Sequence, residues 1–531
     1  MLAAVLLTAC GGDETADGDS EDTSSDSAAE SPQPGGAVVY GITGETDGWS
    51  PATSQWTPGG LNVARAVYDP LAAFDAEGRP QPYLAESIEP SEDFTTWTIT
   101  LREGVRFHNG DPLTAAIVAE NLEAVRASGL IGPTLKLITS IDPSDERTVV
   151  VEMSEPWASF PVLLAQQPGF VAHPEVLNED PNVPIGTGPF AYESWVVGDR
   201  FVATRNADYW QVDEEGNQLP YLDQVEFRVL PEPSTREASL SSGDVDLMQT
   251  NAPSTLVDYG PELDAGEGYN VYNTPAATDE QLIALNTQSF ATDEPKFREA
   301  LALATDREAL NEQLYEGAFE IADTPYPDES RWDADVAWPE YDPERARELL
   351  DEVAAAGLDT EVTLSTGANT ESLALAQAIA AMWEEAGITT EIESFEPTTL
   401  TLNIVTGQYE AAPFSLFNAP DPDGDYHFLD PSNRAPHGEL SLDFTRYHSP
   451  RLKENMDAAR RTTDEAERAE SYAKVWEEIA ENVPLIWLWH TEFVIVATDS
   501  VKGIDQMVLP DGEPAQLVNW GSVFLTRVWR A

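Results

Sequence analysis

The sequence predicts a mixed α/β fold built from several packing units. A chain of 531 residues corresponds to three or four such units at roughly 150 residues per domain. Short strands and helices alternate from residue 37 onward, and no repeat of about 20 to 50 residues indicates a solenoid. A strand at 361–365, a helix at 371–386 and a strand at 388–394 follow one another at a spacing typical of an α/β lobe.

The first ten residues, MLAAVLLTAC, form a short apolar run that ends in Cys10, the only cysteine. Such a run is too short to span a bilayer and is typical of a signal segment. The last four residues, LTAC, resemble the lipobox of bacterial lipoproteins, whose cysteine carries a lipid after cleavage. We therefore expect residues 1–10 to be a lipoprotein signal segment and Cys10 to hold the chain at the outer face of a membrane. No Lys or Arg precedes the apolar run, so the natural start is expected upstream.

Residues 11–36 are rich in Gly, Ser, Asp, Glu, Thr and Ala and contain no basic residue. A segment of this composition cannot bury enough apolar surface to order itself, so we expect a disordered acidic tether.

The first half of the globular part is predicted from periodicity and helix signals. Thr114 is a favourable N-cap for a helix with Val118 and Leu122 on one face, and a glycine at 243 closes a short helix at 235–243. Strands are expected at 38–42, 97–101, 148–153, 201–205, 224–230 and 244–248.

Helix signals are clearest in the second half. Thr305 with Glu308 forms a capping box, and Asp342 before Pro343 predicts another helix start. Asp464 opens a helix that Pro484 ends. The chain then closes with strand-like segments at 485–489 and 492–497.

The chain carries 28 basic and 95 acidic residues, a formal net charge of −67 at pH 7. Nucleic acid and anionic lipid surfaces would be repelled by this charge, so we exclude them as partners. Dense counter-ions would screen the carboxylates, which favours a saline medium; an acid-rich proteome without salt adaptation is the alternative.

Motifs for catalysis and for metal binding are absent. The chain has no GxSxG, HExxH, Walker A or GxGxxG sequence, and its six histidines are scattered. The segment DPDGD at 421–425 alternates carboxylates, but its glycine and its twelfth position do not match an EF-hand. We expect neither a cofactor nor a metal. Aromatic side chains are the other candidate binding groups, and we select Trp49, Trp56, Trp487 and Trp489 as pocket-lining residues.

A series of motifs resembles the family 5 extracellular solute-binding proteins, the dipeptide- and oligopeptide-binding subunits of ABC importers. The resemblance covers residues 37–531. In order, the motifs are WTITLREGVRFHNG at 97–110, PIGTGPF at 184–190, NADYW at 206–210, SGDVD at 242–246, FREAL at 297–301, DR at 306–307, YDP at 341–343 and DP at 421–422.

The resemblance implies a two-lobe, periplasmic-binding-protein-like fold of the large class II type. By analogy, the first lobe comprises residues 37–75, 188–283 and 497–531, with an inserted subdomain at 76–187. The second lobe comprises residues 284–496, so the chain would cross between lobes near 284 and 497.

The resemblance also implies ligand contacts in the stretch that precedes the Asp-Pro dipeptide, where relatives place an Asp that pairs with the peptide's ammonium group. That position is Asn418 here, which has no charge, and Asp421 or Asp423 could substitute for it. The implied contact residues of this stretch are Phe414, Ser415, Leu416, Phe417, Asn418, Asp421 and Asp423.

The expected function is capture of a small solute, most often a peptide in this family, by closure of two lobes and its delivery to an ABC permease. We expect a monomer that is not an enzyme. Three alternatives stay open: the same fold could bind a non-peptide solute such as an oligosaccharide, it could act as a sensory receptor, or the chain could be a secreted acidic hydrolase.

Overall fold

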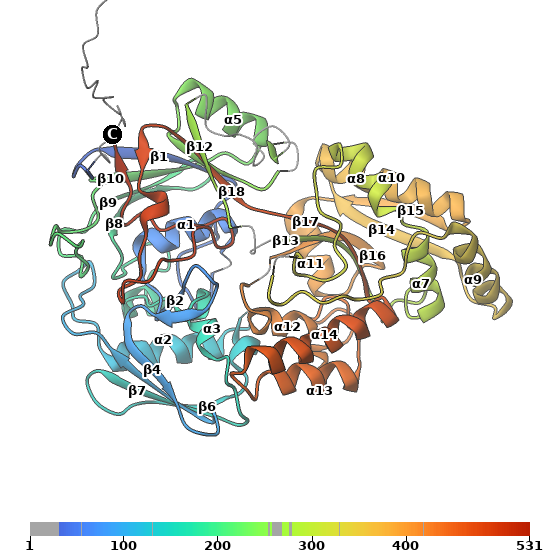
Figure 1. The fold of residues 1–531 in the computed structure, drawn as a ribbon, viewed down its shortest axis with the longest axis horizontal. Helices are drawn as coiled ribbons and strands as arrows, with labels where there is room; N and C mark the ends of the chain where they lie inside the picture. The colour runs from blue at the N-terminus through green and yellow to red at the C-terminus, as the bar shows by residue number, and fades with distance from the viewer. Residues whose placement is uncertain are drawn as a thin grey trace, which may run out of the picture. The chain divides into compact units, whose positions relative to one another are not determined.

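The computed structural model describes residues 31–54, 56–129, 131–252, 255–256, 268–274, 279–328, 330–417 and 419–531 (Figure 1). Within these residues the strands form three larger sheets and two short pairs. Helices pack against the larger sheets, so the predicted mixed α/β class is confirmed.

A seven-stranded sheet is centred on β1 (Ala37–Ile42), the first strand predicted from the sequence. β1 lies between two parallel neighbours, β10 and β11. Val38, Tyr40 and Ile42, which share one face of β1, are buried, and Val39 on the other face is half-buried. The strand order is β12 (Tyr269–Tyr272), β18 (Val494–Thr498), β11 (Leu247–Thr250), β1, β10 (Gln224–Val229), β9 (Arg200–Arg205) and β8 (Phe190–Val196).

Helix α1 (Pro58–Val67) packs against β8 and β9 of this sheet. The helix starts at Pro58 because the Thr57 hydroxyl accepts a hydrogen bond from the Gly60 backbone, and proline is favoured at the first helical position. Almost every residue of α1 is buried, including the charged Arg65.

The second large sheet has four antiparallel strands, and α2 (Ala115–Ala127) packs against its β6 and β7 strands. As predicted, Thr114 caps α2 and its hydroxyl accepts from the Ile117 backbone. The strand order is β4 (Ala85–Pro90), β5 (Thr96–Leu101), β7 (Thr148–Met153) and β6 (Ile138–Pro143).

The five-stranded sheet belongs to the second half of the chain, and α10 (Thr370–Ala386) packs on its β14 and β15 strands (Figure 1). Its parallel part contains the strand–helix–strand unit predicted from the sequence. The strand order is β15 (Thr389–Phe395), β14 (Glu361–Gly367), β16 (Ala411–Phe417), β13 (Asp279–Leu285) and β17 (Leu485–Thr491).

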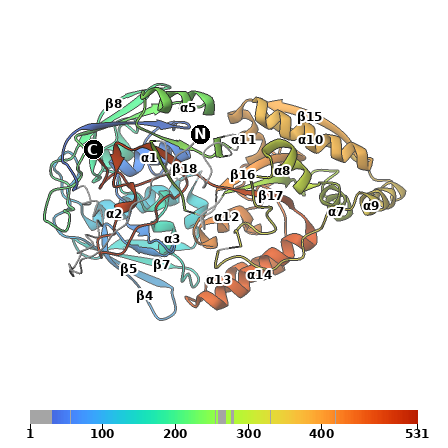
Figure 2. The same ribbon diagram turned by 45° about the horizontal axis from the view of Figure 1, so that its top comes forward.

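Helix α13 (Pro450–Ala459) and the longer helix α14 (Glu465–Asn482) lie side by side in both views (Figure 2). The other helices and strands are α3 (Pro161–Leu164), α4 (Pro174–Asn178), α5 (Pro233–Ser242), α7 (Pro295–Leu303), α8 (Arg307–Tyr315), α9 (Pro343–Ala355), α11 (Pro397–Val405), α12 (Tyr426–Leu429), β2 (Ala72–Phe74), β3 (Pro80–Pro82), β19 (Val501–Lys502) and β20 (Trp529–Arg530).

Most helix ends lie where the sequence predicts them. Asp342 and Asp464 cap α9 and α14, and Gly243 ends α5 in the left-handed conformation that glycine favours. The capping box at Thr305 is wrong: Asp306 caps α8, and the Thr305 hydroxyl instead donates to the Leu301 carbonyl at the end of α7. The strand expected at 244–248 begins only at residue 247, because the turn after α5 continues through residue 246.

The chain passes from the seven-stranded to the five-stranded sheet between Tyr272 and Asp279, and it returns between Thr491 and Val494. The lobe boundaries expected from the resemblance, with crossings near residues 284 and 497, stay a prediction.

Candidate ligand-binding site

The segment 419–425, which we call the Asp-Pro loop, follows β16 and contains Asp421 and Asp423. The Asp421 carboxylate accepts two hydrogen bonds of 2.6 Å, one from each terminal nitrogen of Arg468 on α14. Asp423 is bound by Arg460 Nε and also accepts a hydrogen bond of 2.7 Å from the indole of Trp157. Both carboxylates are buried, so each already has a cationic partner inside the protein.

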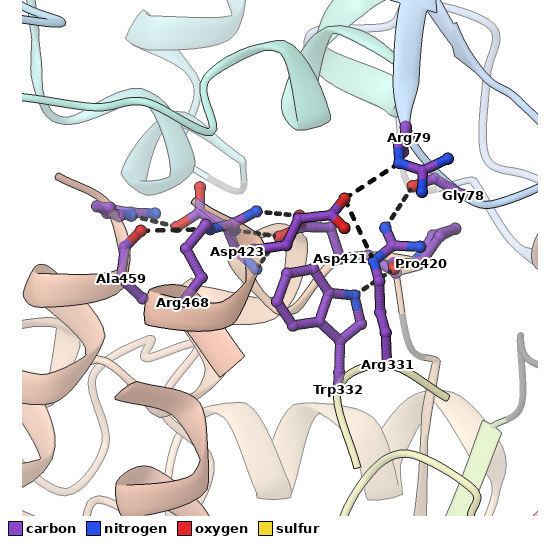
Figure 3. Close-up of polar contacts among 12 residues, drawn as sticks. Gly78, Arg79, Arg331, Trp332, Pro420, Asp421, Asp423, Ala459 and Arg468 are labelled. Atoms are coloured by element: carbon purple, nitrogen blue, oxygen red, sulfur yellow. Dashed lines mark hydrogen bonds and ion pairs between the residues drawn. The ribbon is translucent and has the colours of Figure 1, made fainter. Parts of the chain in front are cut away.

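Aromatic rings complete the surroundings of these ion pairs (Figure 3). The Arg468 guanidinium lies 4.9 Å from the ring centre of Trp332, whose indole donates a 2.9 Å hydrogen bond to the Pro420 carbonyl. Burial lowers the pKa of Arg468 and the Asp421 carboxylate raises it, with a net shift upward. Arg468 therefore stays charged, and its ion pair with Asp421 anchors the loop to α14.

These contacts bear on the hypothesis that Asp421 or Asp423 binds a ligand's amine. A ligand ammonium would have to displace a guanidinium, which would leave a buried cation without a partner. In the structure, each carboxylate is therefore paired with an arginine and not with a ligand amine. A role of either carboxylate in ligand binding stays a prediction.

The Asp-Pro loop also contacts the segments that neighbour the four-stranded sheet. Trp157, which bonds Asp423, precedes α3, and the adjacent Ala158 backbone donates a 2.6 Å hydrogen bond to the Arg460 carbonyl. Arg331 donates to the carbonyls of Glu77 and Gly78. The two halves of the chain therefore meet at this loop.

A cavity of about 220 Å³ opens beside the start of α1. It adjoins the Asp-Pro loop, because Gln166 lines the cavity and its Nε2 would be overlapped by a β-carbon placed on Gly424. The lining residues are Trp56, Thr57, Pro58, Leu61, Arg65, Ala165, Gln166, Gln167, Phe170, Asn519 and Trp520.

Three residues that line the cavity carry hydrogen-bond donors that the protein does not fully use. Gln166 Nε2 and Trp56 Nε1 are buried and have no hydrogen-bond partner. Arg65 donates only through Nε, to the Ser522 hydroxyl at 2.8 Å, and forms no ion pair within the described residues. No Asp or Glu lines the cavity, although the chain has 95 acidic residues.

Phenylalanine rings hold Arg65 in place. Its guanidinium carbon lies 4.7 Å from the ring centre of Phe524 and 5.9 Å from that of Phe170. Burial lowers the pKa of Arg65 to about 10, so the side chain is still a cation at neutral pH. The cavity wall therefore carries a net positive charge.

Sequence reasoning missed Arg65 and Gln166. The only sequence signal for Arg65 was a basic residue inside the apolar segment LNVARAV of a very acidic chain. Gln166 has no such signal, because its place beside the cavity depends on how α3 packs.

Two buried carboxyl groups, those of Asp279 and Asp425, lie close enough to influence each other. Asp279 begins β13 and Asp425 ends the loop, and neither forms an ion pair with a described Lys or Arg. Burial raises the pKa of both, and for Asp279 the neighbouring Asp425 adds to the rise. Asp425 also accepts a 2.7 Å hydrogen bond from the Ala419 backbone, which fixes the turn of the loop.

The predicted tryptophans lie in two kinds of surroundings. Trp49, Trp487 and Trp489 are each only 1% exposed and belong to the apolar cores. Trp487 borders a narrow space of about 20 Å³, whereas Trp56 lines the larger cavity. Of the four predicted rings, Trp56 is the one beside a space large enough for a ligand group.

The predicted contact stretch forms β16, whose Phe414, Ser415 and Leu416 are half-buried. The Ser415 hydroxyl donates a 3.1 Å hydrogen bond to the Gln281 side chain on the neighbouring strand. The side chain of Phe417, together with Asn418 and Cys10, lies outside the described residues, so those predictions are untested.

Within the described residues, no group of three or more His, Cys, Asp or Glu side chains could hold a metal ion. None of the described helices combines the length and apolar character needed to cross a bilayer.

Comparison with known proteins identifies the family. A family model described as bacterial extracellular solute-binding proteins, family 5 Middle, matches residues 79–436. The nickel-binding periplasmic protein of Escherichia coli (strain K12) is 26% identical over 473 residues, which cover 85% of this chain and 88% of that protein. The oligopeptide-binding protein AppA of Bacillus subtilis (strain 168) is 25% identical over 543 residues, covering 95% of this chain and 94% of AppA.

Solved structures share the fold. AppA from Bacillus subtilis in complex with a nonapeptide superposes with a TM-score of 0.77 and 22% identity, over 94% of this chain and 100% of that one. The binding protein AgaA of A. tumefacien R10 in complex with agropinic acid gives 0.79 and 22%, over 93% and 99%. The predicted two-lobe binding-protein fold is confirmed, and the chain belongs to the family 5 bacterial extracellular solute-binding proteins.

Proposed function

We propose that this chain is the lipid-anchored, extracytoplasmic substrate-binding subunit of an ABC importer for peptides. The observation that carries the proposal is the cavity beside α1, which adjoins the place where the two halves of the chain meet. The relatives support the ligand class, since AppA is named for oligopeptides and matches over 95% of this chain.

Closure of the lobes supplies the physical mechanism. A solute that contacts both halves binds the closed form better than the open form, and this difference in affinity shifts the population towards closure. The hydrogen bond from Trp157 to Asp423 and the bonds from Arg331 to the carbonyls of Glu77 and Gly78 form only when the halves are together. The permease would then recognise the closed form.

The cavity itself of about 220 Å³ holds a side chain or a terminal group, but not a whole peptide. We therefore place one end of the solute there. The remainder would extend past the Asp-Pro loop towards β16, which agrees with the contact stretch that the family resemblance implies.

The proposal is tested by mass spectrometry of small molecules released when the purified full chain is denatured. We expect peptides in stoichiometric amounts, and we expect added peptides to be recovered intact after incubation. Cleavage of the added peptides would contradict a transport function and favour the hydrolase alternative. Release of a stoichiometric non-peptide solute would contradict the peptide ligand but would still support a solute-binding function.

A further inference from the structure

We propose that the cavity beside α1 is an anion subsite in which Arg65, Gln166 and Trp56 bind a carboxylate of the transported solute. The inference rests on the proposed function and adds to it the chemical group that the cavity selects. For a peptide, the group is the terminal carboxylate or an acidic side chain at the end of the peptide.

The first argument is the kind of polar group that the protein leaves unused. Buried polar groups in folded proteins nearly always have a hydrogen-bond partner, so an unpartnered one calls for an explanation. Gln166 Nε2 and Trp56 Nε1 are such groups, and both can only donate. The Arg65 guanidinium adds its terminal nitrogens, which also only donate and have no partner in the described residues. A carboxylate accepts several hydrogen bonds and is therefore the kind of group that these donors would bind.

The second argument is charge. Arg65 is 5% exposed and has no carboxylate partner, whereas Arg460 and Arg468, which are similarly buried, are each paired with an aspartate. The buried Arg236, Arg298 and Arg446 also lack an ion pair among the described residues, but their terminal nitrogens donate to backbone carbonyls, and those of Arg65 do not. A buried cation without a counter-ion destabilises the fold, and a bound anion would remove that penalty. No Asp or Glu lines the cavity, so no carboxylate of the wall would repel a bound anion.

The third argument is that Arg65 is held rigidly. The bond from Nε to Ser522 and the rings of Phe524 and Phe170 fix the plane of the guanidinium. A planar guanidinium that is already oriented loses little freedom when it binds a carboxylate through two parallel hydrogen bonds.

The experiment compares two peptide libraries on the full chain after co-purified solute has been dialysed away. Random tripeptides and pentapeptides are offered either as free acids or as carboxyl-terminal amides without acidic residues, and bound peptides are quantified by affinity-selection mass spectrometry. We expect the amides to bind roughly 10-fold to 100-fold more weakly, because a hydrogen bond to a charged group is lost. We expect Arg65→Gln to weaken binding of the acids by a similar factor and to abolish the difference between the libraries.

Matched variants separate binding from folding. Trp56→Phe removes one cavity donor but keeps the ring, and Trp529→Phe makes the same change at a buried indole that also lacks a partner but lies away from the cavity. Arg236→Gln is the control for Arg65→Gln, because Arg236 is a buried arginine whose terminal nitrogen already donates to two backbone carbonyls. Only the cavity variants should reduce the preference for acids.

The outcomes test the carboxylate subsite separately from peptide binding. If acids and amides bind the unaltered chain equally well, the anion subsite is refuted while peptide binding stands. If neither library binds, both the peptide ligand and its carboxylate subsite are refuted. If Arg65→Gln does not fold, the acid-to-amide ratio of the unaltered chain and of Trp56→Phe decides the question.

Discussion

The ion pair between Asp421 and Arg468 gives the sharpest test of what the Asp-Pro loop does. The substitution Asp421→Asn keeps the shape of the side chain and removes its charge. The Arg468 side chain is only 8% exposed, so the substitution leaves a buried guanidinium without a counter-ion. Breaking a buried pair from one side costs ~3–5 kcal/mol in free energy of unfolding. At about 2–4 °C per kcal/mol for a domain of this size, the melting temperature should fall by roughly 6–20 °C.

Differential scanning calorimetry of three variants measures this effect. Besides Asp421→Asn, we would measure Arg468→Met and the double variant, because an ion pair predicts that the double variant is less destabilised than the sum of the two singles. Glu481→Gln is the control, since the pair of Glu481 with Arg451 is exposed and is expected to contribute no more than about 1 kcal/mol.

Ligand affinity measured on the same variants tests the alternative role. If Asp421 is structural, the folded Asp421→Asn variant binds the co-purified solute with an affinity close to that of the unaltered chain. An unchanged melting temperature together with a loss of affinity of about tenfold or more would refute our reasoning. Asp421 would then be the partner of a ligand amine.

Four further predictions follow from single residues. Burial raises the pKa of Asp443 to about 7, whereas an aspartate in the unfolded chain titrates near pH 4, so stability should fall as pH rises from about 4 to 7. Thermal unfolding of Asp443→Asn over this range should show a smaller fall, and an equal fall would contradict the assignment. Cys10→Ser should release the protein into the medium with unchanged ligand affinity; continued membrane attachment would rule out the lipid anchor. Trp489→Ala should lower stability by ~3–5 kcal/mol, because the ring is 1% exposed in the core; weaker ligand binding at an unchanged melting temperature would place the ring in the binding site instead. Gly78→Ala places a β-carbon 2.7 Å from the proline β-carbon of the Asp-Pro loop and should weaken both lobe closure and ligand affinity, as measured by small-angle scattering and calorimetry. Gly512→Ala, at a positive-φ glycine with open space around it, is the control, and an equal effect there would show that backbone strain alone is responsible.

Local signals in the sequence were sufficient for the fold class, for most helix ends and for the family. Caps such as Asp342 and Asp464 act within a few residues of themselves, so their effect can be read without the rest of the chain. The family motifs are likewise short strings in a fixed order. The error at Thr305 arose because two adjacent residues could both cap, and the packing at the end of α7 used the hydroxyl of the first.

The partners of charged side chains could not be predicted in this way. Asp421 is paired with a residue 47 positions later, and Arg65 bonds a serine 457 positions away. Periodicity tells which face of an element is buried, but it does not tell which distant group lies opposite that face. The sequence by itself determined an α/β solute-binding protein of family 5. Only the tertiary structure decided which buried carboxylates are paired with a guanidinium and which arginine lines the cavity, because that depends on distances between segments far apart in the chain.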